Sequence, residues 1–488
     1  MKRNIFNIFL KNTENNFSKN FIKIKENNKW KWYSHGHILS YVNNCSYKLK
    51  QYNLKRGDRI AYKGKNSLEW LTWNLATYSN GYVWVPMYAE QDIDYCNHII
   101  NDSQSKLLIT NENIKIKDIQ TISNVIESDS NCNNISNINN DVSNFIYTSG
   151  TTGKPKGVVL THENILSNLD GIHERFKNNP DNITSLNLLP WAHIYGLTCE
   201  LYFSLLYNNK IALCSDKTAF IKECKEVKPD VLYVVPKVLE TVKSKINFLD
   251  KPVIKNLLPY VLKRIFGGKL QHIFIGGAKL DKNTKYFFEK NNVKICEGYG
   301  TSELSPIISL NHSEKPRNID SIGKILDNVE VKIIDDEICV NGPNLMSGYW
   351  NNLDETKKVL FEYNNKTWYK TGDSGYIKDD FLFYTGRISE NYKLSNGKFV
   401  NVSELESKIK KYISGNFIVY GDNYDYNILI TDSDKKPELN IINSNIENYL
   451  QIKTIILINK NVMEKFLTPK MSIKRKALIN YLIENNCI

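Results

Sequence analysis

Segments with helical periodicity alternate with short apolar runs along most of this chain. Residues 67–81 place Leu68, Leu71, Leu75 and Tyr78 at helical spacing, and a glycine can cap the end of the segment. The apolar run that follows, YVWVPMY, favours a strand that is stopped by its proline, and another helix-like and another strand-like stretch come next. Because strands joined by helices run parallel in one sheet, the alternation predicts an α/β fold.

The second half of the chain continues the alternation and then changes. Near residue 320 the pattern gives way to shorter β segments. After Arg387 come a hairpin-like stretch, a capping-box pattern from Ser403 to Glu406 that opens a helix, three strands and a basic helix. We therefore expect residues 1–386 to form a large N-terminal domain of layered α/β subdomains plus β segments. Residues 387–488 should form a small, mobile α+β C-terminal lid.

Two segments fit this pattern poorly. Residues 111–143 are polar, rich in asparagine and nearly free of aromatic side chains, which predicts a surface excursion. The first residues, MKRNIFNIFLKN, are basic and partly apolar but lack the long apolar stretch and small-residue cleavage site of a signal peptide. We expect a frayed end there, with a weak mitochondrial presequence or a membrane-touching segment as alternatives.

The composition narrows the class of function. Of the 488 residues, 41% are hydrophobic, which is ordinary for a chain with a buried core. The net charge of +12 would suit an anionic partner, but abundant lysine, asparagine, isoleucine and tyrosine indicate a compositional bias, so nucleic acid is not expected as a partner. The nine cysteines show no C-x-x-C pair and no zinc-like spacing. No apolar run approaches the roughly 18 residues that span a bilayer. We expect free thiols and a cytoplasmic location, with peripheral membrane contact as an open alternative.

Residues 147–162, YTSGTTGKPKGVVLTH, concentrate groups that bind phosphate. The first eleven of them hold three glycines, two lysines and four Ser or Thr hydroxyls. This is not a Walker A loop, because Gly150 and Gly153 are only three residues apart and Pro155 follows Lys154. The β-branched run that follows favours a strand. We therefore expect a strand, a glycine-rich loop and a second strand that together hold and release a polyphosphate.

Eight further motifs occur downstream in a fixed order. They are LPWAHIYG (189–196), VVPKVLE (234–240), FIGGAKL (274–280), EGYGTSEL (297–304), VNGPNLMSGYW (340–350), YKTGDSGYI (369–377), YTGRISENYKLSNGKFV (384–400) and LTPKMSIKRKAL (467–478). Together with the phosphate loop they resemble the signature of adenylate-forming enzymes, the superfamily of acyl-CoA synthetases, luciferase and nonribosomal-peptide adenylation domains. The resemblance covers about residues 30–485 and is closest in pattern to long-chain fatty acyl-CoA synthetases.

The resemblance implies a function. It implies ATP-dependent activation of a fatty acid to acyl-AMP, followed by transfer of the acyl group to coenzyme A. ATP, Mg²⁺ and CoA would be the cofactors, and a fatty acid and coenzyme A the partners. Two alternatives stay open: an acyl-adenylating enzyme that passes the acyl group to a carrier protein, and a weakly active or inactive protein that binds ATP and acyl groups.

The resemblance also assigns roles to residues. His193 would lie near the acyl carboxylate and the α-phosphate, and Thr301 would contact that phosphate. Glu303 would carry Mg²⁺, Asp373 would bind the ribose, and Glu390 would be the hinge of the lid. The full set expected to contact ATP is Thr148, Ser149, Gly150, Thr151, Thr152, Gly153, Lys154, Lys156, Gly276, Gly277, Ala278, Tyr299, Gly300, Thr301, Asp373 and Arg387.

Within that set, Tyr299 would offer a flat face to adenine, and Arg387 would donate to the ribose or a phosphate. Trp191 and Tyr195, beside His193, would line the acyl channel. Taken singly, these residues have plainer interpretations, such as a core tyrosine or a structural histidine. Their weight comes from the order of the surrounding motifs.

One position departs from the family's pattern. Long-chain members carry a lysine directly after a Thr-Pro-x-Met stretch, and that lysine reaches the α-phosphate to drive adenylation. Here Ser472 follows the stretch, and a serine cannot replace the positive charge. Lys470 or Lys474 could take over, and Lys474 is the residue we expect. Adenylation could instead be slow or lost, or the short motif could be aligned out of register.

Overall fold

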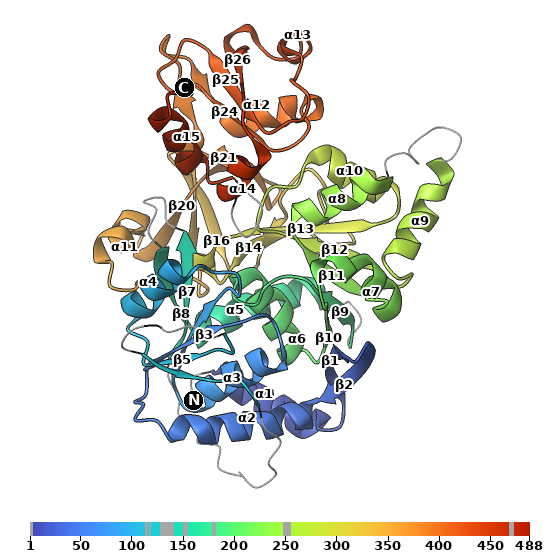
Figure 1. Cartoon of the computed structure of the whole chain (residues 1–488), viewed down its shortest axis with the longest axis vertical. Coiled ribbons are helices and arrows are strands. Elements are labelled where there is room, and N and C mark those ends of the chain that lie inside the picture. The colour runs from blue at the N-terminus through green and yellow to red at the C-terminus, as the bar shows by residue number, and fades with distance from the viewer. Residues whose placement is uncertain are drawn as a thin grey trace.

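The computed structural model describes residues 3–112, 116, 119–126, 141–149, 155–177, 182–246, 255–467 and 473–488. These residues form two large β-sheets covered by helices, and a smaller unit at the C-terminal end of the chain (Figure 1). This mixed architecture confirms the predicted α/β class. Within the part of the chain that is described, no helix combines the length and the apolar character needed to cross a bilayer.

The first sheet has seven strands in the order β18-β8-β7-β4-β3-β5-β6. Their bounds are β3 Arg59–Lys63, β4 Val83–Met87, β5 Leu107–Ile109, β6 Gln120–Ile122, β7 Val142–Ser149, β8 Pro155–Thr161 and β18 Gly348–Tyr349. Four neighbouring pairs of strands in this sheet are parallel, as the helix–strand alternation predicts: β6–β5, β5–β3, β3–β4 and β4–β7. β8 turns back antiparallel on β7, and β18 joins β8 from far along the chain.

Helix α3 (Leu68–Ser79) lies at the centre of this part of the molecule. Every one of its residues except Glu69 is buried, which is typical of a helix enclosed on all sides. α1 (Ile5–Asn16) and α2 (His35–Lys50) pack against it, and α4 (Ile93–Ser103) packs on β8. The helices and strands expected between residues 67 and 110 are thereby confirmed, although β4 continues through its proline.

The second sheet has fourteen strands, with the main order β16-β17-β20-β21-β15-β14-β13-β12-β11-β9-β10-β1-β2 and β19 on β20. The bounds are β1 Asn20–Glu26, β2 Lys29–Ser34, β9 Thr184–Asn187, β10 Lys210–Leu213, β11 Val231–Val234, β12 His272–Ile275, β13 Lys294–Gly300, β14 Ile307–Leu310, β15 Lys324–Ile325, β16 Glu330–Ile334, β17 Glu337–Asn341, β19 Leu360–Tyr363, β20 Lys366–Lys378 and β21 Phe381–Arg387. Pairing is parallel from β1 to β13 and antiparallel from β13 onward. The sheet therefore changes character at the carboxyl end of β13, a common place for ligand sites in α/β proteins.

Helices cover both faces of the parallel part. On one face lie α7 Phe220–Val227, α8 Pro236–Ile246, α9 Leu258–Ile265 and α10 Lys282–Lys290. The other face meets α5 (His162–Phe176), a π-helix η1 (Tyr195–Tyr202) and α6 (Phe203–Leu206). Because strand side chains alternate, Tyr233 and Phe274 of β11 and β12 point toward α5 and η1.

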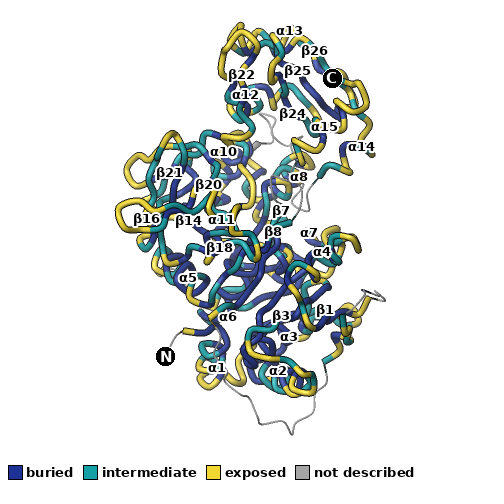
Figure 2. Tube along the Cα trace, turned by 90° about the vertical axis from the view of Figure 1, so that its left-hand side faces the viewer, coloured by how far each residue is buried: buried dark blue, intermediate teal, exposed yellow. Residues whose placement is uncertain are grey.

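The chain after β21 forms the smaller unit at the top of Figure 1. Its elements are β22 Tyr392–Lys393, β23 Phe399–Val400, α12 Val402–Ile409, β24 Phe417–Tyr420, β25 Asn427–Thr431, α13 Leu439–Asn443, β26 Ile452–Leu457, α14 Lys460–Lys465 and α15 Arg475–Glu484. Two apolar cores lie wholly within this unit, and Figure 2 shows its buried interior separated from that of the body by more exposed chain. We keep a domain boundary at residue 387 as a proposal, supported by these separate cores.

Two local expectations were wrong. The chain from Arg3 onward is not frayed, because α1 buries Ile5, Phe6 and Phe9 in the main core. The helix after residue 400 is not capped by Ser403: its N-cap is Asn401, whose side chain accepts from Glu404 N. Packing against the core orders the first helix, and the side chain of Asn401 sets the start of the second. The local sequence pattern did not determine either feature.

Other expectations fall partly outside the described residues. The strand–loop–strand arrangement at 147–162 is confirmed by the antiparallel pair β7 and β8, but residues 150–154 of the loop are not described. Much of the polar excursion, including residues 127–140, is also outside. Its described part is tied to the fold, since β6 pairs with β5 and Trp73 Nε1 donates to Asn124 O over 2.8 Å.

Replacing Phe9 by alanine should destabilise the protein by about 3–5 kcal/mol, because the change removes a fully buried ring from α1 and leaves a cavity. Urea unfolding followed by tryptophan fluorescence measures the effect. Lys11→Ala, on the exposed side of the same helix, is the matched control and should shift stability by less than about 0.5 kcal/mol. Equal unfolding midpoints for Phe9→Ala and the unmodified protein would contradict a core role for α1.

Candidate active site

The candidate site lies where β13 ends beside β20 and β21. Tyr299 donates a hydrogen bond from its hydroxyl to Asp373 Oδ2 over 2.6 Å. Arg387 places its Nε 3.0 Å from the other carboxylate oxygen, Asp373 Oδ1. Asp373 and Arg387 are direct partners in the β20–β21 register, so the sheet itself sets this contact. A phenol, a carboxylate and a guanidinium from three strands thus form one cluster.

Burial controls the charges of this cluster. Asp373 is 2% exposed. Removal from water raises the pKa of its carboxyl to about 6, although Arg387 and Tyr299 act in the opposite direction. Burial also raises the pKa of the Tyr299 hydroxyl, which therefore stays a hydrogen-bond donor. Near neutral pH the cluster presents a carboxylate held between a neutral donor and a cation.

Thr301 follows β13 and offers an unused polar atom. Its backbone N–H donates to Pro306 O over 3.0 Å. Its Oγ1 is buried near the hydroxyl of Tyr369 but makes no hydrogen bond of ordinary geometry among the described residues. Buried hydroxyls are nearly always bonded, so this atom is suited to a ligand. Gly300 before it leaves no space for a side chain, since an added Cβ would lie 1.8 Å from the Pro306 carbonyl oxygen.

Glu303, in the short 3-10 helix η5 (Ser302–Leu304), is linked to the β7–β8 hairpin. The hydroxyl of Tyr349 donates to Glu303 Oε1 over 2.7 Å. Tyr349 belongs to β18, where it pairs with Val158 of β8. One carboxylate oxygen is therefore positioned by the same strand that extends the hairpin. This arrangement brings the expected metal carrier and the base of the expected phosphate loop together.

Lys156, at the base of that loop, has protein partners of its own. Its ammonium forms an ion pair with Glu355 of α11 (Leu353–Val359) and lies 5.3 Å from the ring centre of Tyr349. Lys156, with Lys358 in addition, lowers the pKa of the Glu355 carboxyl to about 2. In this structure Lys156 is therefore engaged with a carboxylate, and a phosphate would compete with Glu355 for it.

His193 is half-buried in the turn before η1. Its Nδ1 accepts from the backbone N–H of Tyr195 over 3.1 Å. In the neutral imidazole this contact assigns the proton to Nε2. Trp191 is fully buried, with its ring centre 5.5 Å from that of Trp70. Its side chain belongs to the core.

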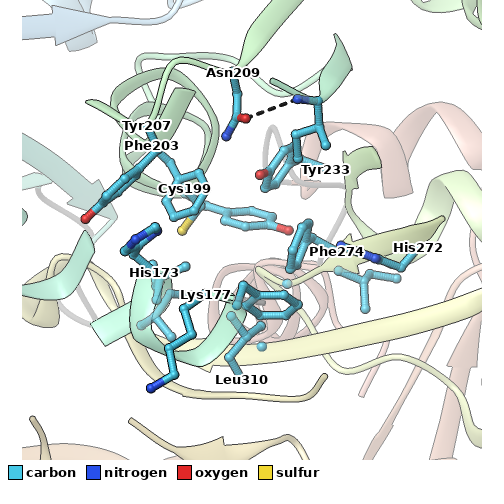
Figure 3. A pocket seen from close by; sticks show the side chains of 18 residues that line it. His173, Lys177, Cys199, Phe203, Tyr207, Asn209, Tyr233, His272, Phe274 and Leu310 are labelled. Atoms are coloured by element: carbon cyan, nitrogen blue, oxygen red, sulfur yellow. Dashed lines mark hydrogen bonds between the residues drawn. The ribbon is translucent and has the colours of Figure 1, made fainter. Parts of the chain in front are cut away.

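An aromatic pocket lies between β11–β13 on one side and α5 and η1 on the other (Figure 3). Its cavity volume is about 50 Å³. Gly276 and Gly298 belong to its lining, and the carbonyl oxygen of Gly298 would lie 3.5 Å from a Cβ on Gly276. Because Tyr299 follows Gly298, one end of the pocket adjoins the Tyr299–Asp373–Arg387 cluster.

The C-terminal unit approaches the cluster through the segment after β21. Glu390, in the 3-10 helix η6 (Ile388–Glu390), has Oε2 3.8 Å from Arg475 Nε at the start of α15. Arg475 also contacts Glu406 at 2.7 Å. Lys474, the residue before, is exposed, and its backbone N–H donates to Phe466 O over 2.7 Å. Residues 468–472, with Lys470 and Ser472, lie outside the described residues.

The structure brings together several of the predicted site residues and leaves others apart. At or beside the cluster lie Tyr299, Gly300, Thr301, Asp373, Arg387 and Glu390. Gly276 lines the adjoining pocket, and Gly277 and Ala278 follow it as exposed residues. Thr148 pairs with Lys156 in the hairpin, and the backbone of Ser149 ends β7. Gly150, Thr151, Thr152, Gly153 and Lys154 lie outside the described residues.

Sequence reasoning missed two residues that organise the site, Tyr349 and Glu355. Tyr349 stands in the motif VNGPNLMSGYW, so the motif was a signal for it. Its contact with Glu303, 46 residues away, depends on the tertiary fold. Glu355 lies outside the quoted motifs, so no motif indicated its contact with Lys156.

The described residues can be tested for a fit to Mg²⁺. They contain no group of three or more His, Cys, Asp or Glu side chains placed to hold a metal ion. Mg²⁺ with a nucleotide does not need such a cage, because it takes most ligands from phosphates and water and only one or two carboxylates from the protein. Glu303, two residues after Thr301, fits that requirement.

Comparison with known proteins gives a consistent result. The family model described as "AMP-binding enzyme" matches residues 12–350. The chain is 29% identical over 288 residues to the long-chain-fatty-acid–CoA ligase of Bacillus subtilis, which covers 56% of this chain and 48% of that ligase. It is 23% identical over 526 residues to fatty acyl-CoA synthetase A of Dictyostelium discoideum. That alignment covers 87% of this chain and 77% of the synthetase. The match to the Bacillus ligase thus spans about half of that protein.

A solved structure shares the fold. The o-succinylbenzoate coenzyme A synthetase (MenE) of Bacillus subtilis, in complex with ATP and magnesium ion, gives a TM-score of 0.76 at 19% identity. The alignment covers 93% of this chain and 96% of that one. This likeness shows an adenylate-forming fold over nearly the whole chain.

Gly300→Ala should lower the melting temperature and displace Thr301, because its methyl group would collide with the Pro306 carbonyl. Gly276→Ala is the matched control: a Cβ there meets its nearest atoms at 3.5 Å, an ordinary contact, and should leave the melting temperature unchanged. Differential scanning fluorimetry compares the two. A Gly300→Ala protein as stable as Gly276→Ala would contradict the tight turn.

Proposed function

Because the chain belongs to the AMP-binding enzyme family, we propose that it is an AMP-forming acid–thiol ligase that activates a fatty acid with ATP and transfers it to coenzyme A. The observation that carries the proposal is the position of the Tyr299–Asp373–Arg387 cluster at one end of an aromatic pocket. A nucleotide at the cluster would have its α-phosphate beside the carboxylate of an acid whose chain occupies the pocket.

In the first step, a carboxylate oxygen of the acid would attack the α-phosphorus, and the bond to pyrophosphate would break. Asp373 would accept hydrogen bonds from the ribose hydroxyls, as an acidic residue does in dinucleotide sites. Thr301 would donate its buried hydroxyl to an α-phosphate oxygen. His193 Nε2 would donate to the acid or the phosphate. These contacts orient two anions that would otherwise repel each other.

Glu303, with its carboxylate already positioned by Tyr349, would hold Mg²⁺ together with the phosphates. The ion would neutralise phosphate charge as bonding to the leaving pyrophosphate changes. The known complex of MenE with ATP and magnesium supports this choice of cofactors. On the protein's side, the phosphate loop and Lys156 would add cations, with Lys156 exchanging Glu355 for phosphate.

In the second step, the thiol of coenzyme A would attack the acyl carbonyl carbon, and AMP would leave. The C-terminal unit would have to move between the steps, because one face cannot serve both chemistries. Glu390, between β21 and the unit's first hairpin, is the proposed hinge, and its contact with Arg475 would change as the unit turns. Lys474, next to Arg475, is the proposed substitute for the lid lysine.

The fatty acid is supported by the Bacillus and Dictyostelium relatives and by the apolar lining of the pocket. Transfer to a carrier protein is the alternative acceptor. A protein that binds ATP and acyl groups without turnover is the alternative if neither Lys470 nor Lys474 replaces the lysine missing at position 472.

Pyrophosphate release should depend on ATP, Mg²⁺ and a fatty acid, and acyl-CoA should form when coenzyme A is added. A coupled phosphate assay over a panel of carboxylic acids measures the first step, and mass spectrometry the second. No pyrophosphate release with any acid of the panel would contradict ligase activity. Accumulation of acyl-AMP in the presence of coenzyme A would favour a carrier protein as the acyl acceptor.

Ser472→Lys should raise the rate of pyrophosphate release about tenfold or more, because it restores a cation aimed at the α-phosphate. Lys474→Ala should lower the rate if Lys474 serves in its place, whereas Lys476→Ala, an exposed lysine two residues on, is the control and should change little. Activity that appears only in Ser472→Lys would identify the natural protein as a pseudoenzyme.

Adenosine affinity should fall as the pH drops through about 6, because the Asp373 carboxyl, whose pKa is raised by burial, then gains a proton and loses its charge. Adenosine is the probe since it lacks phosphates that titrate in the same range. Asp373→Asn should weaken binding about tenfold or more and remove the pH dependence. Calorimetry measures both, with exposed Asp379→Asn as the control. Unchanged affinity in Asp373→Asn would exclude a ribose contact.

A further inference from the structure

The aromatic pocket is not uniformly apolar. Its walls combine ring faces with polar atoms from four elements and the loop before β10, among them Phe176, Tyr195, Asn209, Tyr233, His272 and Phe274. Tyr233 and Phe274 are stacked partners across β11 and β12, with ring centres 4.9 Å apart. His272 meets the edge of Phe274 at 4.8 Å, and Figure 3 shows these three side chains together along the strands.

Two polar atoms of this lining are buried without a hydrogen bond. They are the hydroxyl oxygen of Tyr195 and Nε2 of His272, neither of which has a partner within the described part of the chain. Tyr195 is 7% exposed and His272 is 2% exposed, so bulk water reaches neither side chain freely. Buried polar atoms in folded proteins are nearly always bonded, so two partnerless atoms on residues that line one cavity call for an explanation, such as a bound polar group.

Both groups are neutral near physiological pH. Burial lowers the pKa of the His272 imidazole to about 4, with His312 adding to the effect. Burial raises the pKa of the Tyr195 hydroxyl well above its ordinary value. A neutral imidazole has one donor and one acceptor, and a phenol can donate and accept. The pair therefore suits an uncharged oxygen group, such as a hydroxyl or a carbonyl.

The two atoms lie at different depths. Tyr195 is beside the nucleotide end, where its ring is 3.5 Å from the position of a Cβ on Gly276. His272 is four residues earlier on β12, which corresponds to about 13 Å along a strand. At the His272 end, the pocket is also lined by Asn209, whose Oδ1 accepts from Ile183 N over 3.2 Å. Figure 3 shows the amide nitrogen of Asn209 turned toward the pocket. Polar groups thus continue to the end far from the nucleotide.

We propose that this pocket selects a fatty acid that carries a hydroxyl or carbonyl oxygen part-way along its chain, bound by His272. The inference rests on the proposed ligase function. A plain alkyl chain would surround His272 Nε2 and Tyr195 with carbon and leave both unpaired, and a hydrogen-bonding site discriminates strongly against an analogue that lacks the partner group. Water retained in the pocket could satisfy the two atoms, but an alkyl chain would have to displace it.

The test compares matched acids on the full-length protein. Pyrophosphate release is measured with stearate and with palmitate, each beside an analogue hydroxylated in the middle of its chain. We expect kcat/KM for a hydroxylated acid to exceed that of its alkyl parent about tenfold or more. Alkyl acids that are used as well as their hydroxylated analogues would overturn the inference and leave the ligase function standing. No release with any acid would instead refute the ligase function.

Two variants locate the effect. His272→Phe keeps a ring among Phe176 and Phe274 and should remove most of the preference, chiefly by improving the alkyl acid. His312→Phe is the matched control, since His312 packs on Phe176 with ring centres 4.4 Å apart but does not belong to the pocket lining, and the preference should persist. Tyr195→Phe, which removes only a hydroxyl, serves if His272→Phe fails to fold. A preference unchanged in both His272→Phe and Tyr195→Phe would overturn the assignment.

Discussion

A buried carboxylate joins the strands on which the candidate site is built. Asp373 is enclosed almost completely, yet it must stay ionised near neutral pH for Tyr299 and Arg387 to hold it. Removing a charge from water is costly unless partners surround it, so β20 and β21 have to pair in this register and the end of β13 has to bring Tyr299 to Asp373. The place where parallel pairing ends and antiparallel pairing begins is thereby also the place where a polar ligand can bind.

The site extends from this point through contacts between distant segments. Tyr349 connects Glu303 to β8, and β8 returns antiparallel on β7 to form the base of the phosphate loop. Lys156 forms an ion pair with Glu355. These contacts place an acidic and a basic group on neighbouring elements, so a nucleotide would exchange one ion pair for another. The aromatic pocket adjoins this site at Gly276, just after β12, and Gly298 of β13.

The pocket shows how a site can be specific without charge. Its walls come from residues that alternate along β11 and β12 and from the π-helix η1, and most of their area is carbon. Within it, Tyr195 and His272 are neutral because they are buried. In such surroundings, a neutral donor or acceptor strengthens the binding of a ligand with a complementary oxygen and weakens the binding of a chain that lacks it.

Much of this protein can be predicted from local sequence. Alternating periodicities determine the α/β class, and Pro155 with the β-branched run after it determines a hairpin rather than a P-loop, because proline disfavours a helix at that point. The ordered motifs pointed to Tyr299, Thr301, Glu303 and Asp373. Other features were decided only by tertiary structure. The N-terminal helix is ordered because Phe6 and Phe9 pack in the main core. Glu355 contacts Lys156, which lies 199 residues earlier in the chain. The partnerless atoms of Tyr195 and His272 are likewise invisible in the sequence, since hydrogen bonding and burial depend on neighbours that only the folded chain supplies.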